Sequence, residues 1–480
     1  MHVRNQLYIG GQWVSPATDD TIEIIAPATE QPFATVAAAA HADIDAAVAA
    51  ARTAFDQGPW PRTDPAERVA VVRQLAQAYG ERRKELAATV SAELGAPITF
   101  AKRAQIGLPP MVMGTLADIA EGYAWQETRP GVYGRPVVVR KEPVGVVAAI
   151  VPWNMPQFLI ATKLVPALLA GCTIVIKPSP ESALDALLLA EVLDQVGLPE
   201  GVVSIVPGGR EAGAHLVAHP GVDKVSFTGS TAAGKQVAAA AAQNLTKVSL
   251  ELGGKSAAIA LDDADPAAVA QAVTLSGINM AFQTCNALTR VIVPAARADE
   301  YAEALAAQFT SQVLGDPADP ATTVGPLVAQ RQQARVTEYI ESGLADGARL
   351  VTGGTGLPDG VERGWYVRPT VFTDVDNSMR IARDEIFGPV LVVIPAADEA
   401  EAVRLANDSD YGLAGSVFTA DTERGFDIAT RVRAGTFGIN EGYMNDPAAS
   451  FGGVKGSGYG RELGREGLES YLDTKSISGA

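Results

Sequence analysis

Short apolar runs alternate with helical patterns from residue 144 onward, and this alternation restricts the folds open to the chain. Nearly continuous apolar strands separated by amphipathic helices indicate a parallel sheet with helices on both faces. The expected strands of the first series are 144–151, 172–177, 202–206, 224–228 and 247–252, and the expected helices are 157–170, 181–196, 210–218 and 230–243. The sequence therefore predicts an α/β fold.

A second series of the same kind follows in the C-terminal half. Its expected strands are 290–294, 348–354, 366–375, 389–396, 415–419 and 436–440. We therefore expect two α/β domains, with a boundary near 253–256, where two adjacent glycines interrupt the pattern. The segment 450–464 is too rich in glycine for regular structure, and we expect it to form a return loop.

The pattern before residue 144 is helical at first and then extended. Helical spacing begins at residue 41 and continues over 64–95, where Asp64 is placed to cap a helix. After Gly131 we expect an extended pair of strands with a turn near Glu142 and Pro143.

The charge balance excludes some partners. The 480 residues contain 38 basic and 55 acidic side chains, a formal net charge of −17. Such a chain repels phosphate backbones and anionic membrane surfaces, and no run of Lys or Arg forms a local basic patch. No stretch reaches the roughly 18 apolar residues that mark a membrane span. We expect neither nucleic acid nor a membrane as a partner.

Cysteine and histidine are scarce. Two cysteines, Cys172 and Cys285, cannot form a disulfide framework in a chain of this length, and no signal peptide is evident, so we expect a reducing, cytoplasmic setting. His215 and His219 are spaced to share a helix face, but Leu216 stands where a zinc protease has its glutamate. We interpret them as surface histidines and expect no metal site.

The glycine-rich run GSTAAGKQ, residues 229–236, follows an expected strand and opens an expected helix. Unpaired N–H groups and the positive dipole end at a helix N-terminus suit a phosphate or pyrophosphate. The spacing also fits most of a P-loop, but Gln236 stands where that motif needs Ser or Thr for magnesium. A helix start that binds no ligand is the structural alternative.

Cys285 and Glu251 are candidates for covalent chemistry. Cys285 lies between an apolar helix and the expected strand at 290–294, and an inert buried thiol is the alternative reading there and the better one for Cys172. Glu251 lies inside an apolar strand, where desolvation raises a carboxyl pKa toward the range of a general base. Its structural alternative is a carboxylate that caps the Gly253–Gly254 turn.

Polar residues follow two neighbouring strands of the first series. Asn154 comes directly after 144–151 between two prolines, where a held amide N–H is a good donor to a developing oxyanion. Lys177 ends the next strand in the same way. Because ligands of open α/β sheets bind at the carboxyl ends of the strands, we expect a shared crevice there.

These residues together resemble the NAD(P)-dependent aldehyde dehydrogenase superfamily, over almost the whole chain. The similarity is carried, in order, by PWNMP (152–156), VIKPSP (175–180), FTGSTAAGK (227–235), LELGGK (250–255), Gln283-Thr284-Cys285, EIFGPV (385–390) and FGGVKGSGYGRELG (451–464). The resemblance implies a Rossmann-like cofactor domain plus an α/β catalytic domain with a small β oligomerisation extension. The implied ranges are 1–121 and 143–253 for NAD(P) binding, 254–449 for catalysis, and 122–142 and 465–480 for the extension of a homodimer or homotetramer.

The resemblance also implies a reaction and its residues. An aldehyde is oxidised to the carboxylic acid with NAD(P)+ through a cysteine thiohemiacetal and thioester. Cys285 is the implied nucleophile, Glu251 the general base, and Asn154 with the backbone amide of Cys285 the oxyanion site. The implied cofactor residues are Pro152, Trp153, Lys177, Ser179, Gly209, Phe227, Gly229, Ser230, Leu252, Glu385 and Phe387.

Two departures from the family pattern affect these expectations. Pro180 stands where NAD-preferring members carry a glutamate that binds the ribose hydroxyls, so a 2′-phosphate would meet no carboxylate there and NADP is possible besides NAD. Phe282 stands where the family usually has glycine, and we expect its side chain to remodel the cysteine loop or the aldehyde pocket.

Two other functions compete with the dehydrogenase. One is a P-loop-like nucleotidase, which Gln236 disfavours. The other is a non-catalytic binding protein of the same fold, which the set Cys285, Glu251 and Asn154 disfavours.

Overall fold

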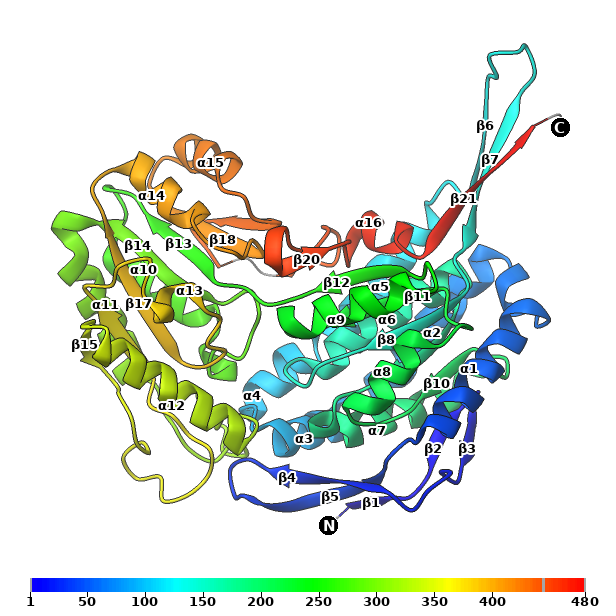
Figure 1. The fold of residues 1–480 in the computed structure, drawn as a ribbon, viewed down its shortest axis with the longest axis horizontal. Coiled ribbons are helices and arrows are strands. Elements are labelled where there is room, and N and C mark those ends of the chain that lie inside the picture. The colour runs from blue at the N-terminus through cyan, green and yellow to red at the C-terminus, as the bar shows by residue number, and fades with distance from the viewer. Residues whose placement is uncertain (1, 443–444, 479–480) are drawn as a thin grey trace.

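Two large sheets form the frame of the computed structural model, which describes residues 2–442 and 445–478 (Figure 1). The first sheet has the order β20-β12-β11-β8-β9-β10-β2-β3. Its five central strands are parallel, and they are the five strands expected for the first series. The strands are β2 (Leu7–Ile9), β3 (Gln12–Val14), β8 (Val146–Ile150), β9 (Thr173–Lys177), β10 (Val203–Ile205), β11 (Lys224–Thr228), β12 (Lys247–Glu251) and β20 (Gly458–Tyr459).

Helices cover both faces of this sheet because its strands are apolar on both faces. In β8, Val147 and Ala149 pack into the core beneath α2, α5, α6 and α7, whereas Val146, Ala148 and Ile150 pack beneath α1, α8 and α9. The helices are α1 (His41–Asp56), α2 (Pro65–Glu81), α3 (Arg83–Leu94), α4 (Ile98–Phe100), α5 (Leu108–Glu121), α6 (Pro156–Ala170), α7 (Ala183–Asp194), α8 (Arg210–Ala218) and α9 (Thr231–Ala242). A π-helical turn, η2 (Ala101–Gln105), separates α4 from α5.

The second sheet has the order β15-β16-β17-β14-β13-β18-β19 and is parallel except for β15. It contains the six expected strands together with β13. The strands are β13 (Ser256–Ala260), β14 (Leu288–Pro294), β15 (Arg349–Thr352), β16 (Thr370–Thr373), β17 (Val390–Ala396), β18 (Ala414–Phe418) and β19 (Thr436–Ile439). The helices around it are α10 (Pro266–Leu275), α11 (Ala298–Thr310), α12 (Gln330–Ala345), α13 (Arg380–Arg383), α14 (Glu399–Asn407) and α15 (Thr422–Arg431). The α/β fold class is confirmed.

Two three-stranded sheets complete the fold. One, of order β21-β7-β6, projects from the body of the molecule and is built from β6 (Gln126–Arg129), β7 (Val137–Pro143) and β21 (Leu472–Ser478) (Figure 1). The expected turn near Glu142 and Pro143 does separate two strands, but the expectation that they form a pair is wrong. β7 joins the projecting sheet and β8 the first large sheet. The other small sheet, of β1 (His2–Arg4), β4 (Thr21–Ala26) and β5 (Gln31–Ala37), was not expected from the sequence.

The glycine-rich segment 450–464 returns the chain from the second sheet to the first. It is not wholly irregular, because it contains the 3₁₀ turn η6 (Lys455–Ser457) and the two-residue strand β20 before α16 (Gly464–Glu469). β20 pairs antiparallel with the end of β12, with Gly458 opposite Glu251. This pairing places the return loop against the C-terminal end of β12. The described residues do not include 1, 443–444 and 479–480. These positions fall in three of the domain ranges that the resemblance implies.

Among the helices that the structure describes, none combines the length and the apolar composition needed to span a membrane.

Candidate active site

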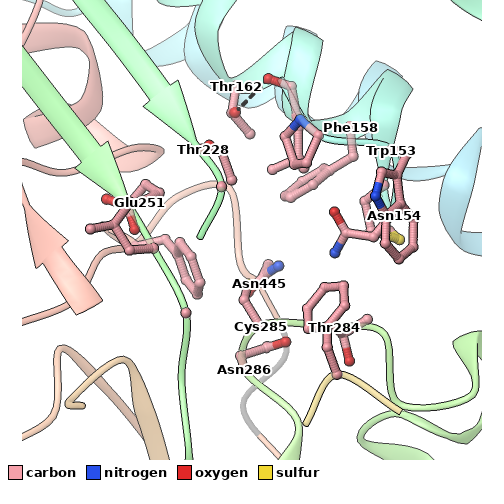
Figure 2. A pocket seen from close by; sticks show the side chains of 18 of the residues that line it. Trp153, Asn154, Phe158, Thr162, Thr228, Glu251, Thr284, Cys285, Asn286 and Asn445 are labelled. Atoms are coloured by element: carbon pink, nitrogen blue, oxygen red, sulfur yellow. Dashed lines mark hydrogen bonds between the residues drawn. The ribbon is translucent and has the colours of Figure 1, made fainter. Parts of the chain in front are cut away.

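A cavity of about 440 Å³ is lined by residues from both α/β regions of the chain, and Figure 2 shows many of their side chains. Cys285, Glu251 and Asn154 all line it. Seven of the expected cofactor residues line it as well, namely Pro152, Trp153, Gly229, Ser230, Leu252, Glu385 and Phe387. The remaining four are not among the described residues that line the cavity: Lys177, Ser179, Gly209 and Phe227. The chain thus brings together three groups with complementary chemistry that are far apart in sequence.

Cys285 lies in the loop between η4 (Ile278–Met280) and β14 and is half-buried at the cavity. Burial raises the pKa of its thiol to about 12, with further contributions from the carboxylates of Glu385 and Glu251. The loop passes so close to Gly254 that a Cβ on that glycine would lie 2.3 Å from the Cys285 carbonyl oxygen. The raised pKa favours the thiol over the thiolate, so the thiol must lose its proton as it reacts.

Asn154 is held by hydrogen bonds on both its backbone and its side chain. Its backbone carbonyl accepts a bond of 2.8 Å from Gln105 Nε2 of the π-helical turn. Its Nδ2 donates a bond of 3.0 Å to the carbonyl of Gln283, and the side chain points toward the cysteine loop (Figure 2). A side-chain amide has two N–H donors, so one remains for an oxygen atom bound beside Cys285.

Glu251, the last residue of β12, is 3% exposed and lines the cavity. Neither carboxylate oxygen has a hydrogen-bond partner among the described residues. The alternative role as a cap of the Gly253–Gly254 turn is wrong, because Ser457 Oγ donates to the Gly253 carbonyl and Glu385 accepts from the Gly254 N–H. An unpartnered buried carboxyl group is available for proton transfer.

Burial raises the pKa of Glu251 well above its usual value, and the nearby charge of Glu462 raises it further. Lys163 and Arg461 act in the opposite direction. Glu462 is ion-paired with Lys163, and it accepts a 2.8 Å hydrogen bond from Thr162. This buried pair was not expected from the sequence. A lone lysine within the apolar helix 157–170 could have indicated that a buried carboxylate lies beside it.

The loop before α9 has the geometry of a phosphate cradle. Ser230 is the N-cap of α9, and its Oγ accepts a 3.3 Å bond from the Ala233 N–H. Phe227 lies beneath this loop, because a Cβ on Gly229 would be 2.6 Å from its ring. Phe227 therefore packs against this loop, and it is not among the described residues that line the cavity. Gln236, the residue that breaks the P-loop pattern, accepts a 2.9 Å bond from Arg210 at the surface.

The rim at the end of β9 carries Lys177, Ser179 and a carboxylate that the sequence analysis missed. Lys177 Nζ donates bonds of 2.8 and 2.7 Å to the carbonyls of Pro178 and Gly208, and burial lowers its pKa to about 8. Glu181 accepts a hydrogen bond from Ser179 and is ion-paired with Arg331. The expectation from Pro180, that a 2′-phosphate meets no carboxylate at that position, did not take this neighbouring residue into account, and it stays a prediction. The glutamate that follows Pro180 provides a carboxylate one position later.

Glu385 and Phe387 close the cavity from the second domain. Glu385 accepts a 2.9 Å bond from the Gly254 N–H, and burial raises its pKa to about 7. Phe387 has a left-handed φ of 62° and packs edge-on against Trp153 at 5.5 Å between ring centroids. Such a backbone conformation is costly for a residue with a side chain, and it is often found at functional sites.

Phe282 is not among the described residues that line the cavity, so the expectation that it remodels the aldehyde pocket is wrong, whereas its alternative, an effect on the cysteine loop, stays a prediction. Its ring is 1% exposed and packs against Phe309 at 5.7 Å in the core of the second domain. Its φ of 55° is left-handed, which explains why glycine suits this position. The packing of the ring in the core offsets the free-energy cost of this backbone conformation.

The other cysteine and the histidines lie away from the cavity. Cys172 is completely buried, and desolvation raises its pKa to about 11. His215 and His219 both approach Asp45 near the surface, at 2.6 and 3.5 Å. The described residues include no group of three or more side chains arranged to hold a metal ion.

Comparison with known proteins identifies the family. Residues 13–477 match the aldehyde dehydrogenase family. The chain is 46% identical to geranial dehydrogenase of Castellaniella defragrans over 98% of both chains, and 44% identical to 3-succinoylsemialdehyde-pyridine dehydrogenase of a Pseudomonas species over 99% of this chain and 98% of that one. Neither the P-loop nucleotidase nor the non-catalytic binding protein is supported.

Solved structures of the same family are similar over their whole length. An aldehyde dehydrogenase of Mycobacterium tuberculosis complexed with NAD+ has a TM-score of 0.97 and 48% identity, covering 100% of this chain and 99% of that one. Aldehyde dehydrogenase C of Pseudomonas syringae, a mutant complexed with NAD+ and octanal, has a TM-score of 0.95 and 43% identity, covering 98% and 96%. On its sequence and its fold, this chain belongs to the aldehyde dehydrogenase family.

Proposed function

We propose that this protein oxidises an aldehyde to the carboxylic acid with NAD+ through a covalent intermediate on Cys285. The observation that carries the proposal is the convergence of Cys285, the free amide N–H of Asn154 and the unpartnered carboxyl group of Glu251 on one cavity. The family match and the NAD+ in the related solved structures support it.

The residues present fit NAD. The N-terminus of α9 with Gly229 and Ser230 suits the pyrophosphate, and Gly209 at the start of α8 has open space beside it. Buried Lys177 uses two of its three N–H donors on carbonyls, which leaves the third for a ribose hydroxyl. In this proposal Glu385 binds the other ribose and Phe387 packs beside the nicotinamide ring. When bound, NAD+ supplies the hydride acceptor.

In the first half of the reaction, Cys285 loses its proton to solvent and its Sγ bonds to the aldehyde carbon. The carbonyl oxygen becomes an oxyanion, which the second N–H of Asn154 and the backbone N–H of Cys285 stabilise. Removal of one such donor typically costs about 3 kcal/mol of transition-state stabilisation. Loss of the aldehyde hydrogen with its electron pair leaves a thioester on Cys285.

In the second half, Glu251 accepts a proton from a water molecule, and the resulting hydroxide bonds to the thioester carbon. The C–S bond breaks, the acid leaves, and Glu251 returns its proton to the Cys285 sulfur, which restores the thiol and the base. Aldehyde, NAD+ and water thus give carboxylic acid, NADH and a proton. The raised pKa of Glu251 suits a group that must take up protons near neutral pH.

NAD is the preferred cofactor in this proposal, and Glu181 provides the reason. Its carboxylate lies beside Ser179 and close enough to Lys177 to act on that lysine's charge. Ribose hydroxyls donate to such a carboxylate, whereas the 2′-phosphate of NADP is repelled by it. Pro180 alone therefore does not determine the selectivity.

The proposal retains the domain ranges that the resemblance implies and the homodimer or homotetramer. The two separate large sheets support the division into a cofactor domain and a catalytic domain. The projecting sheet supports the extension, because Val132 and Tyr133 at its tip are 98% and 97% exposed, which is unusual for apolar side chains. The cytoplasmic setting stays a prediction.

The experiment is a measurement of both products. We expect equimolar carboxylic acid and NADH from an aldehyde and NAD+, and no phosphate release when the same protein is incubated with ATP and Mg²⁺. Reduced cofactor without carboxylic acid would contradict the proposal.

A further inference from the structure

The cavity has two ends that lie on opposite faces of the first sheet. The cofactor cradle belongs to α8 and α9 on one face, whereas the other end is lined by side chains of α4, η2, α5 and α6 on the opposite face. We call this second end the apolar arm. It is formed by Phe100, Ala104, Leu108, Phe158, Leu159 and Phe451.

The charged side chains among the described residues that line the cavity are Glu251, Arg335, Glu385 and Glu462, and none of them belongs to the apolar arm. Arg335 donates to the carbonyls of Glu385 and Ile386 on the cofactor side. Glu462 is paired with Lys163, and Glu251 is the proposed base. The basic side chains within the arm's own π-helical turn, Lys102 and Arg103, are exposed and are not among the described residues that line the cavity.

Uncharged polar side chains also line the cavity, and two of them lie beside Cys285. Thr284 Oγ1 and Asn445 Oδ1 are buried and have no hydrogen-bond partner among the described residues. Figure 2 shows both side chains beside Cys285, where the carbonyl reacts, and Phe158 farther away in the arm. The tail of a substrate therefore meets carbon atoms.

We propose that the substrate is a neutral aldehyde with an apolar tail, which the apolar arm binds. This inference rests on the proposed function. A carboxylate tail would be desolvated without a partner in the arm, and a cationic tail would find no carboxylate among the six residues that form it. Burial of each methylene group is expected to raise kcat/KM roughly fourfold until the arm is filled.

The test measures kcat/KM with NAD+ for propanal, hexanal and octanal, for succinic semialdehyde, whose tail is a carboxylate, and for betaine aldehyde, whose tail is a quaternary ammonium group. We expect a rise of at least tenfold from propanal to hexanal, and values for both charged aldehydes at least a hundredfold below hexanal. A charged aldehyde as the best substrate, or no dependence on tail length, would overturn the inference. Failure of every aldehyde, propanal included, would overturn the proposed function as well.

A variant places a charge in the arm. Ala104→Arg is expected to lower kcat/KM for hexanal and to raise it for succinic semialdehyde at least tenfold. Ala104→Leu is the matched control, because it adds volume without charge and should leave succinic semialdehyde poor. Leu108→Lys repeats the experiment at a second position if Ala104→Arg does not fold. If Ala104→Arg and Ala104→Leu change kcat/KM for succinic semialdehyde equally, the arm does not contact the substrate tail.

Discussion

The side-chain amide of Asn154 donates a 3.0 Å hydrogen bond to the carbonyl of Gln283, two residues before Cys285. This bond ties the loop after β8 to the cysteine loop of the second domain. It also orients the second amide N–H, because the two N–H bonds of a planar amide have a fixed angle between them.

Asn154→Ala removes both functions of this amide. We expect kcat to fall 10²- to 10³-fold, because one oxyanion donor is lost, while the Kd of NAD changes little. Steady-state kinetics and a fluorescence titration of NAD measure the two quantities. A loss of NAD binding with kcat within tenfold of the wild type would assign Asn154 to the cofactor site instead.

Glu462→Gln shifts the pH dependence of turnover in a defined direction. The base must be deprotonated, so kcat rises with pH through the pKa of Glu251. Glu462 raises that pKa, and its replacement by a neutral amide lowers it. The acidic limb of the kcat profile therefore moves to lower pH. Glu466→Gln, a change of an exposed carboxylate four residues later, is the control and should leave the limb in place. The role of Glu462 would be contradicted if the acidic limb moved to higher pH in Glu462→Gln, or if it moved equally in Glu462→Gln and Glu466→Gln.

Cofactor selectivity should respond to Glu181 and to Pro180 in opposite directions. Glu181→Gln lowers the ratio of kcat/KM for NAD to that for NADP, by about tenfold, because a repulsion of roughly 1–3 kcal/mol toward the 2′-phosphate disappears. Pro180→Glu adds a second carboxylate and raises the ratio. An unchanged ratio in both variants would show that this rim does not approach the ribose.

Phe282→Gly tests whether the Phe282 ring belongs to the hydrophobic core or to the aldehyde pocket. Loss of a buried phenyl ring costs about 3–5 kcal/mol, and relief of the left-handed backbone returns about 1–2 kcal/mol, so we expect a net destabilisation of roughly 1–4 kcal/mol. The midpoint of denaturant unfolding measures it, with Phe309→Leu as a control in the same contact. Aldehyde selectivity should not change. Altered selectivity at unchanged stability would place the ring in the pocket after all.

Much of the fold could be predicted because the buried parallel strands are short apolar runs, and their carboxyl ends placed Asn154 and Lys177 at one edge. The pairing of β7 with β21 could not be derived from the local pattern, because the two strands are more than 300 residues apart, and only the family resemblance grouped their segments. Glu462 and Lys163 were missed for a similar reason, since a return loop brings them together. Phe282 was misplaced because the direction of a side chain depends on φ, which the residue type does not determine.

The central claim is that Cys285 carries a covalent intermediate and that Glu251 activates the water molecule that hydrolyses it. Peptide mass spectrometry of Glu251→Gln mixed with hexanal and NAD+ tests this claim most directly. We expect about one equivalent of NADH in a rapid burst, and a hexanoyl group on the peptide that contains Cys285. Cys172→Ala in the same background should retain the adduct, and Cys285→Ala should abolish both the burst and the adduct. An adduct on Cys172, or a burst that survives in Cys285→Ala, would contradict the account.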